Sequence, residues 1–104
     1  MPSSVSYSAR ARQDVQREWH YLHTNAGAHT ADRLLAALER TSALLASNPH
    51  IGTLYNPRAL RTASVRRLPL SLPFGRWLLF YEAAKTGILV HRLAHGARDL
   101  SGLL

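Results

Sequence analysis

Two apolar runs separated by a short turn lie near the carboxyl end of the sequence. They read Trp77-Leu78-Leu79-Phe80-Tyr81 and Ile88-Leu89-Val90-His91-Arg92-Leu93-Ala94, with Lys85-Thr86-Gly87 between them. The first run has no polar position, so we expect a central strand, over residues 76–82, that is covered on both faces. The second predicts a strand over residues 87–94, and the turn joins the two into a hairpin. A basic, histidine-bearing segment follows, which favours an acidic partner.

Two helices are expected before this hairpin. Ser8 is placed to cap a helix from residue 9 to about 24, and a break at residues 25–27 separates it from a second helix over 28–47. The apolar positions of each helix fall on one face. They are Ala11, Val15, Trp19 and Leu22 in the first helix, and Leu34, Leu38, Thr41 and Leu45 in the second. Two amphipathic helices joined by a short loop predict an antiparallel helical hairpin.

The remaining strands complete the expected fold. Val5 and Tyr7 alternate with serines, as in a short strand, and residues 50–61 show no period and are interpreted as a loop. Residues 63–70 predict another strand, in which Pro69 favours an edge or a strand end. The order strand, helix, helix, strand, strand, strand predicts an α+β fold, with a helical hairpin packed on a small antiparallel sheet. A chain of 104 residues suits one domain over residues 1–104.

Charge is distributed unevenly along the chain. The net charge is +7; residues 1–50 carry five arginines and four acids, a net of +1, while residues 51–104 carry seven arginines, one lysine and two acids, a net of +6. Arginine presents a planar fork that matches carboxylate or phosphate in two places. We therefore expect a basic surface on the second half that binds an acidic protein, a nucleic acid or both.

Several classes of protein are excluded by composition. The chain has no cysteine, which rules out disulfides and thiolate metal sites. No run of eighteen apolar residues and no apolar signal-peptide core is present, so we expect a cytoplasmic protein that does not enter a membrane. His20 and His23 have a spacing that can bind metal, but no third ligand is placed near them. We expect neither a metal nor another cofactor.

The sequence resembles the RelE/ParE superfamily of toxins from bacterial type II toxin–antitoxin systems. The likeness covers almost the whole chain and rests on four segments in order. These are the opening strand with Ser8-Ala9-Arg10-Ala11-Arg12-Gln13-Asp14-Val15, then Asn48-Pro49-His50-Ile51-Gly52, Gly75-Arg76-Trp77-Leu78-Leu79-Phe80-Tyr81 and Arg92-Leu93-Ala94-His95-Gly96-Ala97-Arg98-Asp99-Leu100. The resemblance implies a toxin that blocks growth until a cognate acidic antitoxin covers it.

Two branches of this superfamily differ in chemistry. ParE-like members bind DNA gyrase, whereas RelE-like members cut messenger RNA on the ribosome. A nuclease of the second kind would use the cations and histidines Arg76, His91, Arg92, His95 and Arg98. However, the RelE-like pattern has clustered lysines and commonly a tyrosine or histidine near its end, while this chain has only Lys85 and ends in Ser101-Gly102-Leu103-Leu104. We therefore expect a ParE-like gyrase inhibitor without covalent chemistry, with a RelE-like endoribonuclease and a non-toxic antitoxin-binding module as alternatives.

The residues expected to bind the target or the antitoxin belong to the basic second half. They are Arg66, Arg67, Arg76, Arg92, His95 and Arg98. Replacing Arg92 and Arg98 together is expected to abolish toxicity while leaving the fold intact. Structural roles compete with these: His95 could cap the last strand, and Arg98 could pair with Asp99. Alternation places His91 on the same side as Leu89 and Leu93, which favours a packed histidine.

Overall fold

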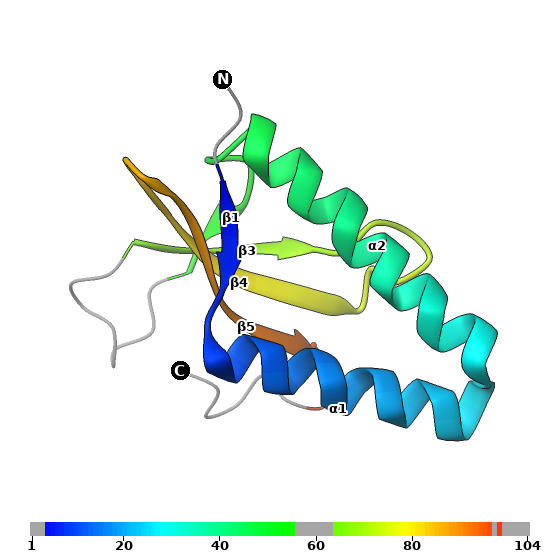
Figure 1. Cartoon of the computed structure of the whole chain (residues 1–104). Helices are drawn as coiled ribbons and strands as arrows, with labels where there is room; N and C mark the ends of the chain where they lie inside the picture. Colours follow the sequence, from blue (N-terminus) through cyan, green and yellow to red (C-terminus); the bar gives the residue numbers. More distant parts are fainter. Residues whose placement is uncertain (1–3, 56–63, 97, 99–104) are drawn as a thin grey trace.

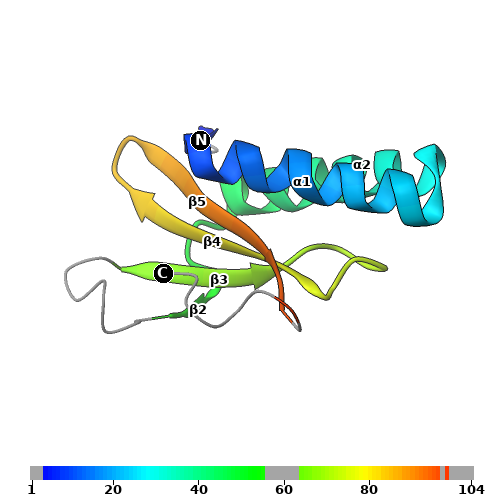
Figure 2. The same cartoon turned by 90° about the horizontal axis from the view of Figure 1, so that it is seen from below.

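A layer of two helices lies against one face of a five-stranded sheet (Figures 1 and 2). The computed structural model describes residues 4–55, 64–96 and 98. The elements follow in the order β1 (Val5–Tyr7), α1 (Ala9–Ala26), α2 (Ala28–Ser47), β2 (Thr53–Leu54), β3 (Val65–Pro69), β4 (Trp77–Ala84) and β5 (Gly87–His95). In the sheet the strand order is β1-β5-β4-β3-β2. The predicted α+β fold with a helical hairpin on a sheet is confirmed.

The residues at both ends of α1 explain where the helix begins and where it ends. The predicted cap is confirmed, since the hydroxyl of Ser8 accepts the Ala11 N–H at 3.0 Å and also donates to the carbonyl of His91 at 2.9 Å. The helix runs to Ala26, two residues beyond the predicted end, because the break comes at Gly27. Gly27 has a φ of 93°, a backbone conformation that favours glycine. From this junction α1 and α2 diverge, and β1 lies near their far ends (Figure 1).

The sheet differs from the prediction in two details. It is mixed rather than wholly antiparallel, because β1 pairs in parallel with β5 through Val5 and Ile88. A two-residue strand, β2, also pairs antiparallel with β3 where a loop was predicted. Neither detail has a sequence signal, since alternation does not specify strand direction and two residues are too few to show a period.

The core has a main part under the helices and a smaller part on the opposite face of the sheet. Leu79 and Tyr81 of β4 belong to the main core, whereas Phe80 packs with Val65 and Ala94 on the other side. All five side chains are fully buried. The prediction that this central strand is covered on both faces is therefore confirmed.

An irregularity in β5 changes the side to which its residues point. Phe80 pairs with Arg92 and Tyr81 pairs with Val90, so His91 is the extra residue of a β-bulge. Leu89, before the bulge, is 38% exposed, whereas Leu93, after it, is buried in the main core. The expectation that His91 shares one side with both leucines is wrong, because the bulge breaks the alternation between them.

The segment after α2 is held against the sheet by Gly52. Its N–H donates to the hydroxyl of the buried Tyr81 at 2.9 Å, and its carbonyl accepts a hydrogen bond from the Arg66 guanidinium at 2.8 Å. Arg66 also donates to the carbonyl of His50 at 3.2 Å. Burial raises the pKa of Tyr81, while the Gly52 hydrogen bond and the Arg66 charge oppose that rise. This contact anchors the strand β2 that follows.

Replacing Gly52 with alanine is expected to lower the free energy of unfolding by about 1–3 kcal/mol. A Cβ atom at this position would lie 2.8 Å from the backbone oxygen of Arg67 and 2.8 Å from the ring of Tyr81, so a strand would have to shift. Gly75→Ala is the matched control, because the nearest atom to its Cβ would be 3.7 Å away. Denaturant unfolding of the two variants checks this, and equal stabilities would contradict it.

Candidate functional site

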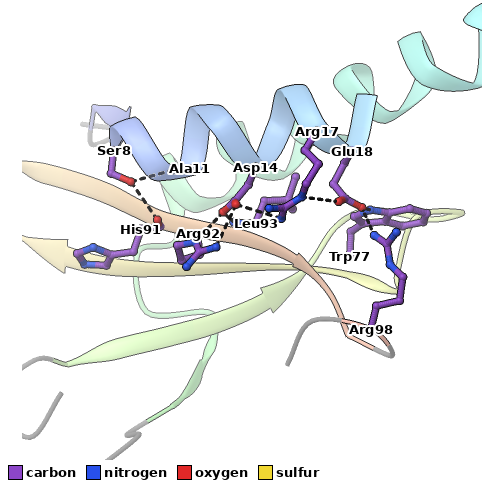
Figure 3. Close-up of polar contacts among 10 residues, drawn as sticks. All are labelled: Ser8, Ala11, Asp14, Arg17, Glu18, Trp77, His91, Arg92, Leu93 and Arg98. Atoms are coloured by element: carbon purple, nitrogen blue, oxygen red, sulfur yellow. Dashed lines mark hydrogen bonds and ion pairs between the residues drawn. The ribbon is translucent and has the colours of Figure 1, made fainter. Parts of the chain in front are cut away.

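Two buried carboxylates lie on the face of α1 that is turned toward the end of β5. Asp14 and Glu18 are one helical turn apart and almost completely buried. Figure 3 shows them above the strands, each approached by arginines from different parts of the chain. A buried carboxylate needs charged or hydrogen-bonding partners, and each of these two has several.

Asp14 holds β5 against α1. It accepts hydrogen bonds from Nε of Arg92 at 2.8 Å and from a terminal nitrogen of the same guanidinium at 3.1 Å. It also accepts the backbone N–H of Leu93 at 3.0 Å and a guanidinium N–H of Arg17 at 3.1 Å. Only 11% of the Arg92 side chain is exposed. This is a bidentate, largely buried ion pair between residues 78 positions apart in the sequence.

Glu18 joins three segments of the chain. One of its oxygens accepts both the indole N–H of Trp77, at 2.8 Å, and a guanidinium N–H of Arg98. Its other oxygen accepts Nε of Arg17 at 3.4 Å. The Arg98 guanidinium lies 4.7 Å above the ring of Tyr21, which is a cation–π contact. Arg98, three residues beyond the end of β5, is thereby held on the surface of α1.

Three of the residues predicted for the site gather around Trp77. The ring of His95 stands edge-on to the Trp77 ring at 4.9 Å, and Arg98 shares Glu18 with Trp77. Arg76 precedes Trp77, is exposed, and accepts the Gly96 N–H at its carbonyl at 2.8 Å. Arg76, His95 and Arg98 thus lie together at the start of β4 and the end of β5.

The other predicted residues lie apart from this group. Arg66 donates to backbone carbonyls, and Arg67, its neighbour on β3, lies 5.9 Å from the ring of Tyr55. Successive residues of a strand point to opposite faces, so these two arginines do not share a surface. His91 contacts Glu82 at 3.2 Å. Within the described residues, the basic residues expected on the sheet therefore do not form one continuous face. The expected contact of Arg98 with Asp99 lies outside the described residues, because Asp99 is not among them.

The buried ion pair of Arg92 bears on the expectation that replacing Arg92 and Arg98 together leaves the fold intact. Removing its guanidinium would leave the buried Asp14 carboxylate without its bidentate partner, which is strongly destabilising. We therefore expect a variant that lacks both Arg92 and Arg98 to lose stability, so that its toxicity would depend on the fold as well as on the target surface. Arg98, whose side chain is 36% exposed, is the better position for a test of function.

Sequence reasoning missed the two carboxylates, although a signal was present. The buried residues of α1 are Ala11, Asp14, Glu18 and Leu22, which follow one another at intervals of three, four and four. The two acids therefore continue a helical stripe that enters the core. An acid within such a stripe predicts a buried basic partner elsewhere in the chain.

Because these two acids are buried, the exposed residues of the helices carry an excess of positive charge. The exposed charged residues of α1 and α2 are five arginines and two acids, a net of +3. They are Arg10, Arg12, Arg17, Arg33, Arg40, Asp32 and Glu39. The sequence assigned the first half a net of only +1, because it counts Asp14 and Glu18, which are buried against arginines of the second half.

A groove runs along α1 on the side facing α2 and β1. One part has a volume of about 510 Å³ and is lined by Val5, Ser6, Tyr7, Arg12, Val15, Gln16 and Leu38. A second part of about 380 Å³ is lined by Val15, Gln16, Trp19, His20 and Leu35. The two parts adjoin at Val15 and Gln16, which line both, and together they are called the groove along α1.

Neither a metal site nor a membrane span is found in the described part of the chain. The rings of His20 and His23 both contact Trp19, at 5.2 and 4.9 Å between centroids. Among residues 4–55, 64–96 and 98, no three histidine, aspartate or glutamate side chains are grouped to hold a metal ion. Over the same residues, neither helix has the length and apolar character needed to cross a membrane.

Comparison with known proteins defines the class as toxins of type II toxin–antitoxin systems. The family described as "ParE toxin of type II toxin-antitoxin system, parDE" matches residues 5–100. The chain therefore belongs to the ParE toxin family. A solved structure titled "Chromosomal ParDE TA system from P. aeruginosa" shares the fold with a TM-score of 0.71 at 14% identity, covering 89% of this chain and 95% of that chain. No curated protein matches the sequence.

Proposed function

We propose that this chain inhibits DNA gyrase and is neutralised by a cognate antitoxin. The observation that carries this proposal is the family match, which extends over residues 5–100. A toxin that acts on gyrase works in the cytoplasm. The exposed cations around Trp77, from Arg76 and Arg98, suit contact with a large anionic assembly of protein and DNA.

The arrangement of the candidate nuclease residues favours a binder over an RNA-cleaving enzyme. Cleavage by attack of a 2′-hydroxyl requires a base, an acid and cations around one phosphate. Arg92 is instead held by Asp14, and His91 contacts Glu82. Lys85 is exposed in the turn between β4 and β5. The five residues named for a nuclease are Arg76, His91, Arg92, His95 and Arg98. They are therefore not all grouped around one possible phosphate site.

The groove along α1 is our proposed antitoxin site. Its lining includes Val15, Leu38 and Arg12. The exposed charged residues of α1 and α2 as a whole carry a net charge of +3. An acidic, amphipathic segment matches both features, because its apolar side chains would fill the groove while its carboxylates face the arginines.

Expression of the isolated chain tests this function against its alternatives. We expect arrested growth with SOS induction and cleaved DNA, and inhibition of supercoiling when the purified chain is mixed with gyrase. Translational arrest with cut messages would instead support the RelE-like alternative. Unimpaired growth and unaffected gyrase would support a non-toxic antitoxin-binding module. Co-expression of the antitoxin is the control, because it should restore growth in the first two cases.

A further inference from the structure

Glu18 links the end of the described chain to the rigid part of the fold. Its Oε1 accepts one hydrogen bond from Trp77 and one from Arg98, which come from β4 and from the segment after β5. Trp77 is itself fixed, since its ring packs edge-on against Phe74 at 5.6 Å and against His95 at 4.9 Å. The carboxylate is therefore held by a donor other than Arg98, and Figure 3 shows Trp77 and Arg98 together at Glu18.

We propose that Glu18 is a positioning residue of the toxin: it holds Arg98 over Tyr21 and next to Arg17, and so forms the surface that contacts the target. The three side chains on this surface face outward, with 54% of the Arg17 side chain, 36% of the Arg98 side chain and 47% of Tyr21 exposed. The inference rests on the proposed gyrase function only for its activity measurement.

The physical basis is pre-organisation of a flexible side chain. An arginine has many rotamers, and ordering it on binding costs affinity. Glu18 orders Arg98 in advance through a charge-assisted hydrogen bond, which is strong because the carboxylate is buried. The cation–π contact with Tyr21 adds a second support below the guanidinium.

Glu18 and Asp14 have different roles, and this makes a clean test possible. Asp14 neutralises the largely buried Arg92, whereas the arginines on Glu18 are more exposed. Glu18→Gln keeps the side-chain length and an oxygen for the Trp77 indole but removes the charge. Arg98 and Arg17 can then turn toward water, so no buried cation is left uncompensated.

The activity test compares wild type, Glu18→Gln, Arg98→Gln and the double variant in gyrase supercoiling inhibition. We expect each single variant to be weaker by at least about tenfold, the size of one charge-assisted hydrogen bond. The double variant should be no weaker than Arg98→Gln alone, because Glu18 acts through Arg98 and its replacement has no further effect once Arg98 is gone. Glu39→Gln, at an exposed glutamate of α2, is the matched control and should stay within about twofold.

A second measurement reads the position of Arg98 directly. By NMR, the Arg98 amide signal should change its chemical shift in Glu18→Gln, and its relaxation should show that the residue is more mobile. Neither change is expected in Glu39→Gln. In Arg98→Gln, the indole N–H signal of Trp77 should shift, since the two donors share one oxygen. This second measurement can still be made if Glu18→Gln does not fold, because in Arg98→Gln the buried Glu18 keeps Trp77 and Arg17 as donors.

Three results would overturn the inference: an unchanged Arg98 signal in Glu18→Gln, an unchanged Trp77 signal in Arg98→Gln, or inhibition losses that multiply in the double variant. If Glu18 had only a structural role, through Trp77, the losses of inhibition of the two single variants would multiply in the double variant. If wild type does not inhibit gyrase, the proposed function fails by itself. Growth inhibition by wild type, the two single variants and the double variant, together with the NMR signals, then tests the role of Glu18.

Discussion

Replacing Asp14 with asparagine is expected to lower the free energy of unfolding by about 3–5 kcal/mol, the usual cost of removing one partner from a buried ion pair. The change leaves the shape of the side chain almost unaltered but removes its charge. The Arg92 guanidinium, bound to Asp14 at 2.8 and 3.1 Å, would then remain in a largely buried site without a counter-charge. The contact between α1 and β5 should be the first part of the fold to weaken.

Denaturant unfolding of the purified variant measures this loss. Asp32→Asn is the matched control, since Asp32 lies exposed on α2 and contacts the Trp19 indole at 3.2 Å. We expect that control to change stability by less than about 1 kcal/mol. If Asp14→Asn proved as stable as Asp32→Asn, the ion pair with Arg92 would have no part in holding β5 to α1.

Replacing Val15 with glutamate is expected to weaken antitoxin binding by at least about 100-fold, equivalent to about 2.7 kcal/mol. Val15 is half-buried and lines both parts of the groove along α1. A carboxylate there would be covered by the antitoxin without a partner and would repel its acidic side chains. Gyrase inhibition should be retained, because the surface of Arg17, Tyr21 and Arg98 is formed without Val15.

Titration calorimetry with the cognate antitoxin measures the affinity, and growth on co-expression gives the cellular readout. Cells with Val15→Glu should stay inhibited in the presence of antitoxin. Gln13→Glu introduces the same charge at an exposed position of α1 that does not line the groove, and its affinity should change by less than about threefold. Tight antitoxin binding by Val15→Glu would place the antitoxin elsewhere on the molecule.

These two variants separate stability from recognition on a single helix. The buried stripe of α1 carries Asp14 and Glu18, which connect it to β5 and to Arg98. A neighbouring face carries Val15 and Gln16, which line the groove. Because the faces differ, α1 can hold the proposed target surface in place and still leave a separate surface for the antitoxin.

The family and the sequence of elements were readable from local pattern. Apolar periods of 3.6 and 2 residues, the cap at Ser8 and the glycine at residue 27 each act over a few positions, so they identify helices and strands without reference to the rest of the chain. The predicted bounds of α2 agree with the structure, and β4 and β5 differ by one or two residues at their ends.

Contacts between distant segments were decided only by the tertiary structure. The parallel pairing of β1, the bulge at His91 and the ion pairs of Asp14 and Glu18 all join residues that lie far apart in the sequence or depend on strand register. Local periodicity shows which side of an element is apolar, but not which element covers it. The position of α1 over β5 placed two acids against arginines some 80 residues later, so among the described residues the helices also carry exposed positive charge, which the count of the first half did not indicate.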